Sequence, residues 1–595
     1  MLEGVTGRIF SLVLAAGLAC AQEPFNNAAL SGSYHFVQLL AAGPSGETRT
    51  LAGAMTFDGK GAFSFSAEGT PGGQGTYAVG AAGNVTFLSP IRDVEYLGAC
   101  LSADREVLIG ASTFAAGSTY DFFVAVRAPS ASVTNALLSG TYGGAWLELA
   151  PRLLKSGLVA LTAGGNGQFT RVAVTGHASD AGGRTVSQAA SSATYNLKSG
   201  GTGTAAFGVA ASLLAGEREI FVSEGGSYLL GRLAGKGILV AAKQGSGDAA
   251  LEGRYWMAEL AVDGPNWSAA SGSLQALGGG RALVAERVRM DGRLVDYAGL
   301  NTYAVSPDGS GTLAPRLAPR LTNMAVGARS FVGAQMGPPE ASTTQYGIFF
   351  GVRAPVFQGP GVFLDPAGVV NGASFAGWPQ PVAPGSIVSL YGTGLAAREA
   401  WSTAYPLPTK LDEVTVTVNG TPAPLYSVSP RRVNIQLPYG LKGSWVTLRV
   451  AHSQGVSNEV TAPLAATSPG VFFYQDYRGA VLHADYSLVS AANPARPGET
   501  VMIWLTGLGE LSPGVGTGAA NPAFPLAWAF EAPISVLFGG EPSPRLHFAG
   551  GAPGFAGLNQ INAAIPLSAP VGASVPVAIL TGNAYTDLVD IPIGR

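Results

Sequence analysis

The side chains that could do chemistry are few and scattered. The five histidines, two cysteines and 37 acidic residues show neither an H-E-x-x-H pattern nor the cysteine spacing of a zinc site. His483 and Asp485 stand two residues apart, so an extended strand would place both on one face, as a weak metal or acid/base pair requires. A solvated loop explains the same pair and is favoured. Because G-x-S-x-G, P-loop and calcium-loop patterns are also missing from the sequence, we expect no catalytic residue, no metal and no cofactor.

Paired carboxylates that hydrolyse glycosidic bonds need not be neighbours in sequence, so a hydrolase site assembled between modules stays open as an alternative. The acids with the clearest context argue against it. Asp58, Glu68, Asp308 and Asp412 all stand in turn-like surroundings, where an acidic side chain caps and solvates a loop. We therefore interpret them as turn residues.

The tryptophans offer a different chemistry, the stacking of an indole ring on a sugar or on a protein partner. Trp146 and Trp256 lie in equivalent first strands of the repeated segments and alternate like core residues. Trp267, Trp401 and Trp528 stand in polar or loop-like surroundings. These three are the candidate ligand-stacking residues.

Composition limits the class of protein. Glycine (84) and proline (39) are abundant in the 595 residues, yet hydrophobic residues reach 47 %, which excludes a disordered chain. Many short strands joined by tight turns fit this combination. Charged residues make only 12 % of the chain and the formal net charge is −3, so we expect no nucleic-acid partner.

The N-terminus has the pattern of an export signal. Arg8 precedes an apolar run, and Ala19-Cys20-Ala21 offers a small-x-small cleavage site, so we expect a signal peptide at 1–21. Lipidation of Cys20 is the less favoured alternative, because Gly17 stands where a lipobox has leucine. No later apolar stretch has the length of a transmembrane helix. The sequence thus predicts an extracytoplasmic protein, secreted or at the cell surface, with no transmembrane segment after the signal peptide.

The elements that must position these side chains come in repeats. Residues 30–39, 138–149 and 251–260 ("LSGSYHFVQL", "LSGTYGGAWLEL", "LEGRYWMAEL") open three similar segments of roughly 110 residues. Each segment has a second tyrosine strand and Gly-rich hairpin turns, as at Asp58-Gly59 and Asp308-Gly309. The fold class is therefore all-β, with β-meander or barrel-like modules at 28–135, 136–249 and 250–358. The pattern leaves barrel and sandwich open.

The last third of the chain contains a second duplication. "APGSIVSLYGTGL" (383–395) and "ARPGETVMIWLTG" (495–507) share a Pro-Gly start, and Thr-Gly-Leu ends the strand in both copies. "VTVTVNGTPAPLYSVSPRRVNIQLPY" (414–439) matches the later "ISVLFGGEPSPRLHF" (534–548) and its continuation. We predict a linker at 359–370 and two Ig-like β-sandwich modules at 371–468 and 469–595.

These strings also carry a family resemblance. Together with "VVNGASF" and "APGFAGLNQINAAIP", they make the region from about Val369 to Ile593 resemble the domain of unknown function at the C-termini of many secreted acidobacterial (Solibacter-type) proteins. The resemblance implies an extracytoplasmic tandem Ig-like unit and no catalytic residues. It does not extend to the first 360 residues.

Three functions follow from these observations. The favoured one is a non-enzymatic adhesion or scaffold protein whose five modules form an extended rod, with a cell-envelope or extracellular glycan or protein as partner. The second is a carbohydrate-binding protein that uses Trp267, Trp401 and Trp528 as stacking platforms. The third is a glycan-acting hydrolase with a site between modules.

Overall fold

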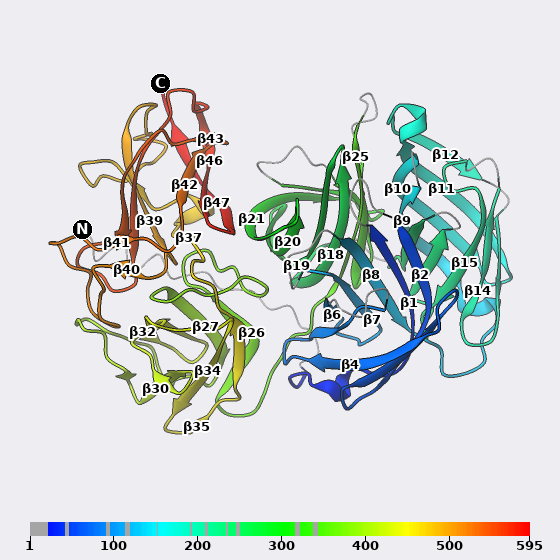
Figure 1. Ribbon diagram of the computed structural model, residues 1–595, viewed down its shortest axis with the longest axis horizontal. Coiled ribbons are helices and arrows are strands. Elements are labelled where there is room, and N and C mark those ends of the chain that lie inside the picture. The colour runs from blue at the N-terminus through cyan, green and yellow to red at the C-terminus, as the bar shows by residue number, and fades with distance from the viewer. Residues whose placement is uncertain are drawn as a thin grey trace.

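The chain folds into two lobes built from strands (Figure 1). The computed structural model describes residues 22–41, 47–90, 96–113, 119–150, 153–190, 193–208, 212–233, 236–245, 250–315, 322–336 and 343–595. No α-helix occurs among them, only single 3-10 turns. The all-β prediction is thus confirmed. The predicted signal peptide and Cys20 lie outside the described residues.

The first repeat is a closed barrel of eight antiparallel strands, because its last strand β8 pairs with its first strand β1. The strands are β1 (Ser31–Ala41), β2 (Arg49–Asp58), β3 (Ala62–Ala67), β4 (Gly73–Val79), β5 (Asn84–Leu88), β6 (Tyr96–Leu101), β7 (Val107–Ala111) and β8 (Tyr120–Arg127). Closure leaves the sheet without an open edge. The question of barrel or sandwich is settled in favour of the barrel.

Repeats two and three close in the same way. In the second, β9 pairs with both β10 and β17, and β12 is an extra strand beside β11. Its strands are β9 (Ser139–Ala150), β10 (Leu153–Gly164), β11 (Gln168–Ala178), β12 (Val186–Ala190), β13 (Ala193–Leu197), β14 (Thr202–Phe207), β15 (Gly216–Val222), β16 (Tyr228–Leu233) and β17 (Gly237–Lys243). Those of the third are β18 (Arg254–Asp263), β19 (Asn266–Gly278), β20 (Arg281–Met290), β21 (Arg293–Val305), β22 (Ser310–Ala314), β23 (Thr322–Val326), β24 (Ser330–Gln335) and β25 (Gln345–Arg353).

The tyrosine and leucine that recur in each repeat have the same structural role in all three barrels. The second tyrosine of each repeat donates its hydroxyl to the carbonyl of the leucine that opens the repeat. The three bonds are Tyr77 to Leu30 (2.7 Å), Tyr195 to Leu138 (2.8 Å) and Tyr303 to Leu251 (3.4 Å). The phenol, buried in Tyr77 and Tyr195 and half-buried in Tyr303, satisfies its hydroxyl this way and ties the chain entry to the fourth strand of each barrel.

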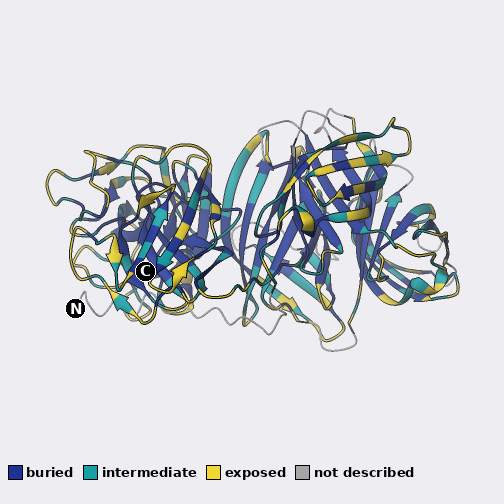
Figure 2. Cartoon of the chain, turned by 90° about the horizontal axis from the view of Figure 1, so that it is seen from below, coloured by how far each residue is buried: buried dark blue, intermediate teal, exposed yellow. Residues whose placement is uncertain are grey.

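The barrels do not form a row (Figures 1 and 2), so the expected rod is wrong. Each barrel contacts the other two, and one hydrophobic cluster continues through all three. Polar side chains bridge every pair: His35 Nε2 to Gly200 O (2.7 Å), Thr113 Oγ1 to Ser271 Oγ (2.6 Å), and Ser156 Oγ to Gln335 O (3.0 Å). Barrel outer faces are apolar here because they are buried against another barrel, which alternation along one strand does not reveal.

The fourth module is an Ig-like sandwich of two sheets. One contains β26 (Phe363–Asn371), β27 (Ile387–Thr393), β28 (Ala400–Trp401), β32 (Leu425–Val428) and β33 (Arg432–Gln436). The other contains β29 (Lys410–Leu411), β30 (Val414–Val418), β31 (Thr421–Pro422), β34 (Trp445–His452), β35 (Gly455–Val456) and β36 (Val460–Pro463). Their inner faces share a valine- and leucine-rich core.

The fifth module repeats this strand order. Its first sheet contains β37 (Gly470–Val471), β38 (Val481–Leu482), β39 (Thr500–Thr506), β40 (Leu511–Ser512), β41 (Trp528–Ala529), β44 (Leu546–Gly551) and β45 (Asn559–Ala564). Its second contains β42 (Ile534–Phe538), β43 (Glu541–Pro542), β46 (Gly572–Thr581) and β47 (Ala584–Ile593). The duplicated sequence therefore encodes a duplicated sandwich.

The duplicated motif marks the two ends of one strand. Gly385 and Gly498 precede β27 and β39 with φ of +74° and +85°, and Gly394 and Gly507 follow these strands with φ of +62° and +93°. Only glycine adopts such angles without strain. The Thr-Gly end also joins the modules, because Thr506 Oγ1 accepts a hydrogen bond from Ile387 N (2.8 Å).

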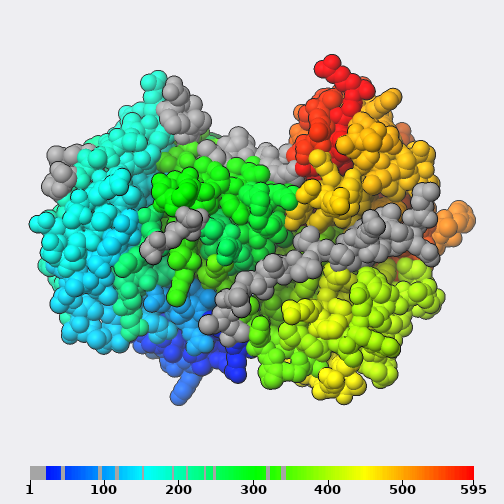
Figure 3. Space-filling model, turned by 180° about the vertical axis from the view of Figure 1, so that it is seen from behind, coloured from blue at the N-terminus to red at the C-terminus, as the bar shows by residue number. Residues whose placement is uncertain are grey.

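The barrels and the sandwiches are connected by more than the chain. Residues 359–370, predicted as a linker, instead include most of β26, which pairs with β27. In addition, β47 pairs in parallel with β21 over Asp296–Gly299 and Ala584–Asp587, so one sheet continues from barrel 3 into the fifth module. In Figure 3 the C-terminal lobe (yellow to red) packs directly beside the barrels (blue to green).

Candidate functional site

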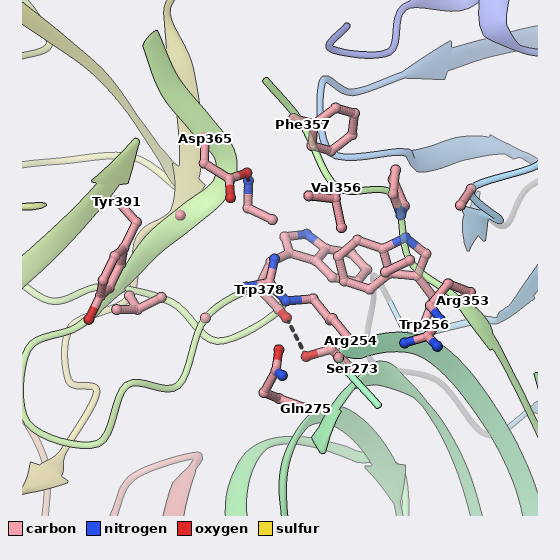
Figure 4. Close-up of a pocket in the computed structure, with 18 of the residues that line it drawn as sticks. Arg254, Trp256, Ser273, Gln275, Arg353, Val356, Phe357, Asp365, Trp378 and Tyr391 are labelled. Atoms are coloured by element: carbon pink, nitrogen blue, oxygen red, sulfur yellow. Dashed lines mark hydrogen bonds between the residues drawn. The ribbon is translucent and has the colours of Figure 1, made fainter. Parts of the chain in front are cut away.

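A large cleft lies where barrel 3 meets the fourth module. Its volume is about 1020 Å³, at the upper end of the range for sites that take drug-sized ligands. Arg254, Trp256, Ser273 and Gln275 reach it from β18 and β19 of barrel 3. Asp365, Trp378 and Tyr391 reach it from the fourth module (Figure 4). A ligand in the cleft would therefore contact both lobes.

Two indoles form the apolar part of the lining. Trp256 and Trp378 meet edge to face, with ring centroids 5.2 Å apart and planes at 79°. Trp378 is half-buried, and a hydrogen bond from Ser273 Oγ to its carbonyl oxygen (2.9 Å) fixes its backbone on barrel 3. Gln380 extends this attachment by donating to the carbonyls of Glu286 (3.0 Å) and Tyr297 (2.7 Å). The loop that carries Trp378 is thus held by barrel 3.

The cleft is positively charged, although the whole chain is slightly acidic. Five arginines and three carboxylates line it, an excess of two positive charges against the chain's −3. The lining residues are Arg254, Arg329, Arg353, Arg431 and Arg432, with Asp104, Glu252 and Asp365. In a partly desolvated cleft such an excess attracts anions more strongly than it would on an open surface.

Asp365 is the carboxylate in the wall of the cleft. Burial raises the pKa of its carboxyl, and the nearby Arg254 guanidinium and a hydrogen bond from Ala367 N (2.9 Å) oppose this shift. Of the other two carboxylates, Asp104 is engaged with Ser102 (2.6 Å) and Arg329 (3.3 Å), and Glu252 is exposed. Asp365 is thus the acid best placed to bind hydroxyl groups of a ligand.

The three predicted stacking residues differ in burial and lie in different modules. Trp267 is only 8 % exposed, because its ring packs against Tyr120 between barrels 1 and 3. It is not available to stack on a ligand, and the prediction for this residue is corrected. Trp401 and Trp528 are 40 % and 46 % exposed, on β28 and β41 of different sandwich modules. None of the three lines the cleft.

The histidine–aspartate pair also proves to be two separate contacts. The imidazole of His483 pairs with Glu499, whereas Asp485 accepts hydrogen bonds from the backbone N (2.9 Å) and Oγ (2.6 Å) of Ser487. No cluster of three or more potential metal-binding His, Cys, Asp or Glu side chains occurs within the described ranges.

Sequence reasoning missed the cleft because its walls come from distant parts of the chain. Trp256 is buried in its strand, at 1 % exposure, as its alternating position predicts. Trp378 was not singled out, although "FAGWPQP" places an indole in a Pro/Gly-rich segment at a module border. One signal was present: Arg254 stands where the other repeats have Ser33 and Thr141.

Comparison with solved structures gives only remote similarity. CghA with Sch210972 is 10 % identical at a TM-score of 0.15, covering 58 % of this chain and 96 % of CghA. The Plexin A4 extracellular region is 7 % identical at 0.13 (91 % and 80 % covered), and the H. pylori beta clamp 8 % identical at 0.08 (54 % and 91 % covered). These scores are too low to support an argument. No curated protein matches the chain.

In the described residues, no helix has both the length and the apolar character needed to cross a membrane.

One part of the chain has an assigned family. The match to a family model covers residues 378–465, which is the fourth module without β26, and includes Trp378 and Tyr391 of the cleft. It does not confirm the resemblance to the acidobacterial domain. Residues 378–465 form an Ig-like domain of the IPT/TIG family.

Proposed function

We propose that this is a secreted or cell-surface protein without catalytic activity, which binds an extracytoplasmic glycan in the cleft between barrel 3 and the IPT/TIG module. The cleft itself supports this proposal most directly. It combines two indoles, polar side chains and a volume of about 1020 Å³, the composition typical of a ligand site. An Ig-like domain beside it fits an interaction role.

Blocking the cleft tests the proposal. Gln275 is half-buried in the lining, and Gln275→Trp would fill the space without removing a core side chain. Gln168→Trp, at an exposed position of barrel 2, is the matched control. On a glycan array we expect the wild type and Gln168→Trp to retain the same glycans and Gln275→Trp to lose them. An array without any retained glycan, or equal retention by all three proteins, would contradict the proposal.

A second contact surface has support from exposure. Seven large aromatic side chains of the sandwich modules are at least 40 % exposed: Trp401, Tyr405, Trp445, Tyr486, Phe524, Trp528 and Phe530. Exposed aromatic rings are typical of adhesive contacts. Loss of array binding in Trp401→Ala/Trp528→Ala, with Gln275→Trp still binding, would assign recognition to this surface instead of the cleft.

The absence of catalysis is testable at Asp365. A buried carboxyl with a raised pKa is the kind of group that protonates a glycosidic oxygen. We expect bound glycans to remain intact over days, with no new reducing ends. Reducing ends that accumulate with the wild type and disappear with Asp365→Asn would show a hydrolase.

A further inference from the structure

We propose that the cleft recognises an anionic saccharide, a short sugar chain whose rings carry carboxylate or sulfate groups. This inference rests on the proposed function and specifies its ligand.

The arginines of the lining differ in how far they are engaged. Arg329 is paired with Asp104 (3.3 Å). Arg254 lies near Asp365 and lowers the pKa of its carboxyl, without a salt bridge between the two side chains. Arg431 is exposed and its guanidinium forms no ion pair or hydrogen bond within the described part of the chain. Because a guanidinium binds carboxylates and sulfates with two parallel N–H donors, Arg431 is free to hold an anionic ligand and Arg254 retains donors for one.

The three repeats distinguish Arg254 from Arg353. Arg353 follows the repeat pattern, since it lies over the Tyr255 ring (4.8 Å) as Arg127 lies over Tyr34 (4.9 Å). Its position is thus explained by the barrel. Arg254 breaks the pattern, because the equivalent positions hold Ser33 and Thr141. A barrel closes without an arginine there, so Arg254 is explained by the cleft.

The uncharged part of the ligand follows from the other residues of the lining. Asp365 and Gln275 offer hydrogen-bond partners for hydroxyl groups, and the half-buried Trp378 ring offers an apolar face. Rings that carry hydroxyls on their edges and C–H groups on their faces match this lining.

The volume of the cleft favours a ligand larger than a single small anion. A cleft of about 1020 Å³ is far larger than a single sulfate or phosphate needs. The distribution of the arginines agrees with a longer ligand. Arg254 belongs to β18 of barrel 3, whereas Arg431 lies beside β33 of the fourth module. Anionic groups on successive rings could reach both walls.

Calorimetry with matched oligosaccharides tests the ligand class. The probes are trigalacturonate, its neutral methyl ester, a heparin-derived tetrasaccharide and cellotriose. We expect trigalacturonate or the sulfated probe to bind, whichever anionic group the cleft prefers, at least 10-fold more tightly than the two neutral probes. The affinity should fall as salt is raised from 50 to 500 mM. Equal affinity for trigalacturonate and its ester, with no binding of the sulfated probe, would overturn the inference.

Variants of the full-length protein assign the effect to the cleft. We expect Arg254→Ser, which installs the residue of barrel 1, and Arg431→Gln each to weaken binding by about 10- to 100-fold, the loss of a charge-assisted contact. Arg449→Gln removes an arginine that is 50 % exposed and lies outside the cleft, and should bind normally. Unchanged binding by the folded Arg431→Gln and Arg254→Ser proteins would overturn the inference.

The two proposals can fail separately. If the array retains only neutral glycans and Gln275→Trp abolishes this, the cleft is a glycan site and only the anionic class is wrong. If the anionic probes bind but Gln275→Trp has no effect, both the cleft and its assigned ligand are wrong.

Discussion

At the scale of single residues, side chains of the same type have different roles in this protein. Arg353 stacks on Tyr255, as the repeat requires, whereas Arg254 occupies a position that holds a smaller residue in the other two repeats. Trp267 is buried between barrels, whereas Trp378 is half-buried beside the cleft. The sequence supports the distinction between the arginines, because the repeats can be compared with each other. It does not support the distinction between the tryptophans, because burial against another barrel leaves no local pattern.

Gly507 allows a residue-scale prediction about the duplicated motif. A β-carbon there would lie 1.9 Å from the Ser468 carbonyl oxygen, in addition to the strain of φ +93°. We expect Gly507→Ala to lower the free energy of unfolding by about 3 kcal/mol or more. Gly420→Ala is the control, since Gly420 has φ +80° with open space around it and should lose only about 1 kcal/mol. Equal losses in urea unfolding would refute the steric explanation.

At the scale of elements, local patterns predicted the strands well. Alternating residues and Gly-rich turns located the three repeats, and the Pro-Gly and Thr-Gly-Leu signals located β27 and β39. Two elements were missed for physical reasons. Strand β26 begins within the predicted linker, where Pro366 and flanking glycines hide its apolar pattern. The pairing of β21 with β47 joins residues almost 290 positions apart, and strand pairing over such a separation has no signature in the sequence.

The β21–β47 pairing gives the element-scale prediction. A β-carbon on Gly299 would lie 2.3 Å from Asp587 Oδ1 and still closer to the Tyr297 hydroxyl of its own strand, so Gly299→Val should displace both side chains and weaken the pairing of the two strands. We expect the lobes to come apart, with a larger radius of gyration in X-ray scattering and faster proteolysis between residues 355 and 370. Gly278→Ala, at an open turn of the same barrel, should leave both unchanged. A Gly299→Val protein that keeps the wild-type scattering profile would show that other contacts hold the lobes together.

At the scale of the whole molecule, the barrels form a cluster instead of a row, and buried histidines lie at two of its interfaces. His35 Nε2 meets the Gly200 carbonyl between barrels 1 and 2, and His177 Nε2 meets the Gln345 carbonyl (2.8 Å) between barrels 2 and 3. Burial lowers the pKa of both imidazoles below the ordinary 6.5, and these hydrogen bonds oppose the shift. The interfaces therefore require neutral histidines.

This requirement predicts a pH dependence with a definite sign. The unfolded chain takes up a proton on each histidine near pH 6.5, whereas the folded chain does so only at lower pH. Stability should be full above about pH 7 and fall on acidification through 6.5, by up to about 1.4 kcal/mol per pH unit for each imidazole. His35→Gln/His177→Gln should flatten the profile in thermal unfolding, and the exposed His547→Gln should not. A wild-type profile that stays flat from pH 7 to 5 would refute the assignment.

The central claim is that ligand recognition takes place where barrel 3 and the IPT/TIG module meet. A crystal structure of the protein with the tighter-binding anionic probe, trigalacturonate or the heparin-derived tetrasaccharide, tests it most directly. We expect sugar density in the cleft, with a carboxylate or sulfate at Arg254 or Arg431 and a ring near Trp378. Density on the Trp401 and Trp528 surface, with the cleft holding only solvent, would contradict it.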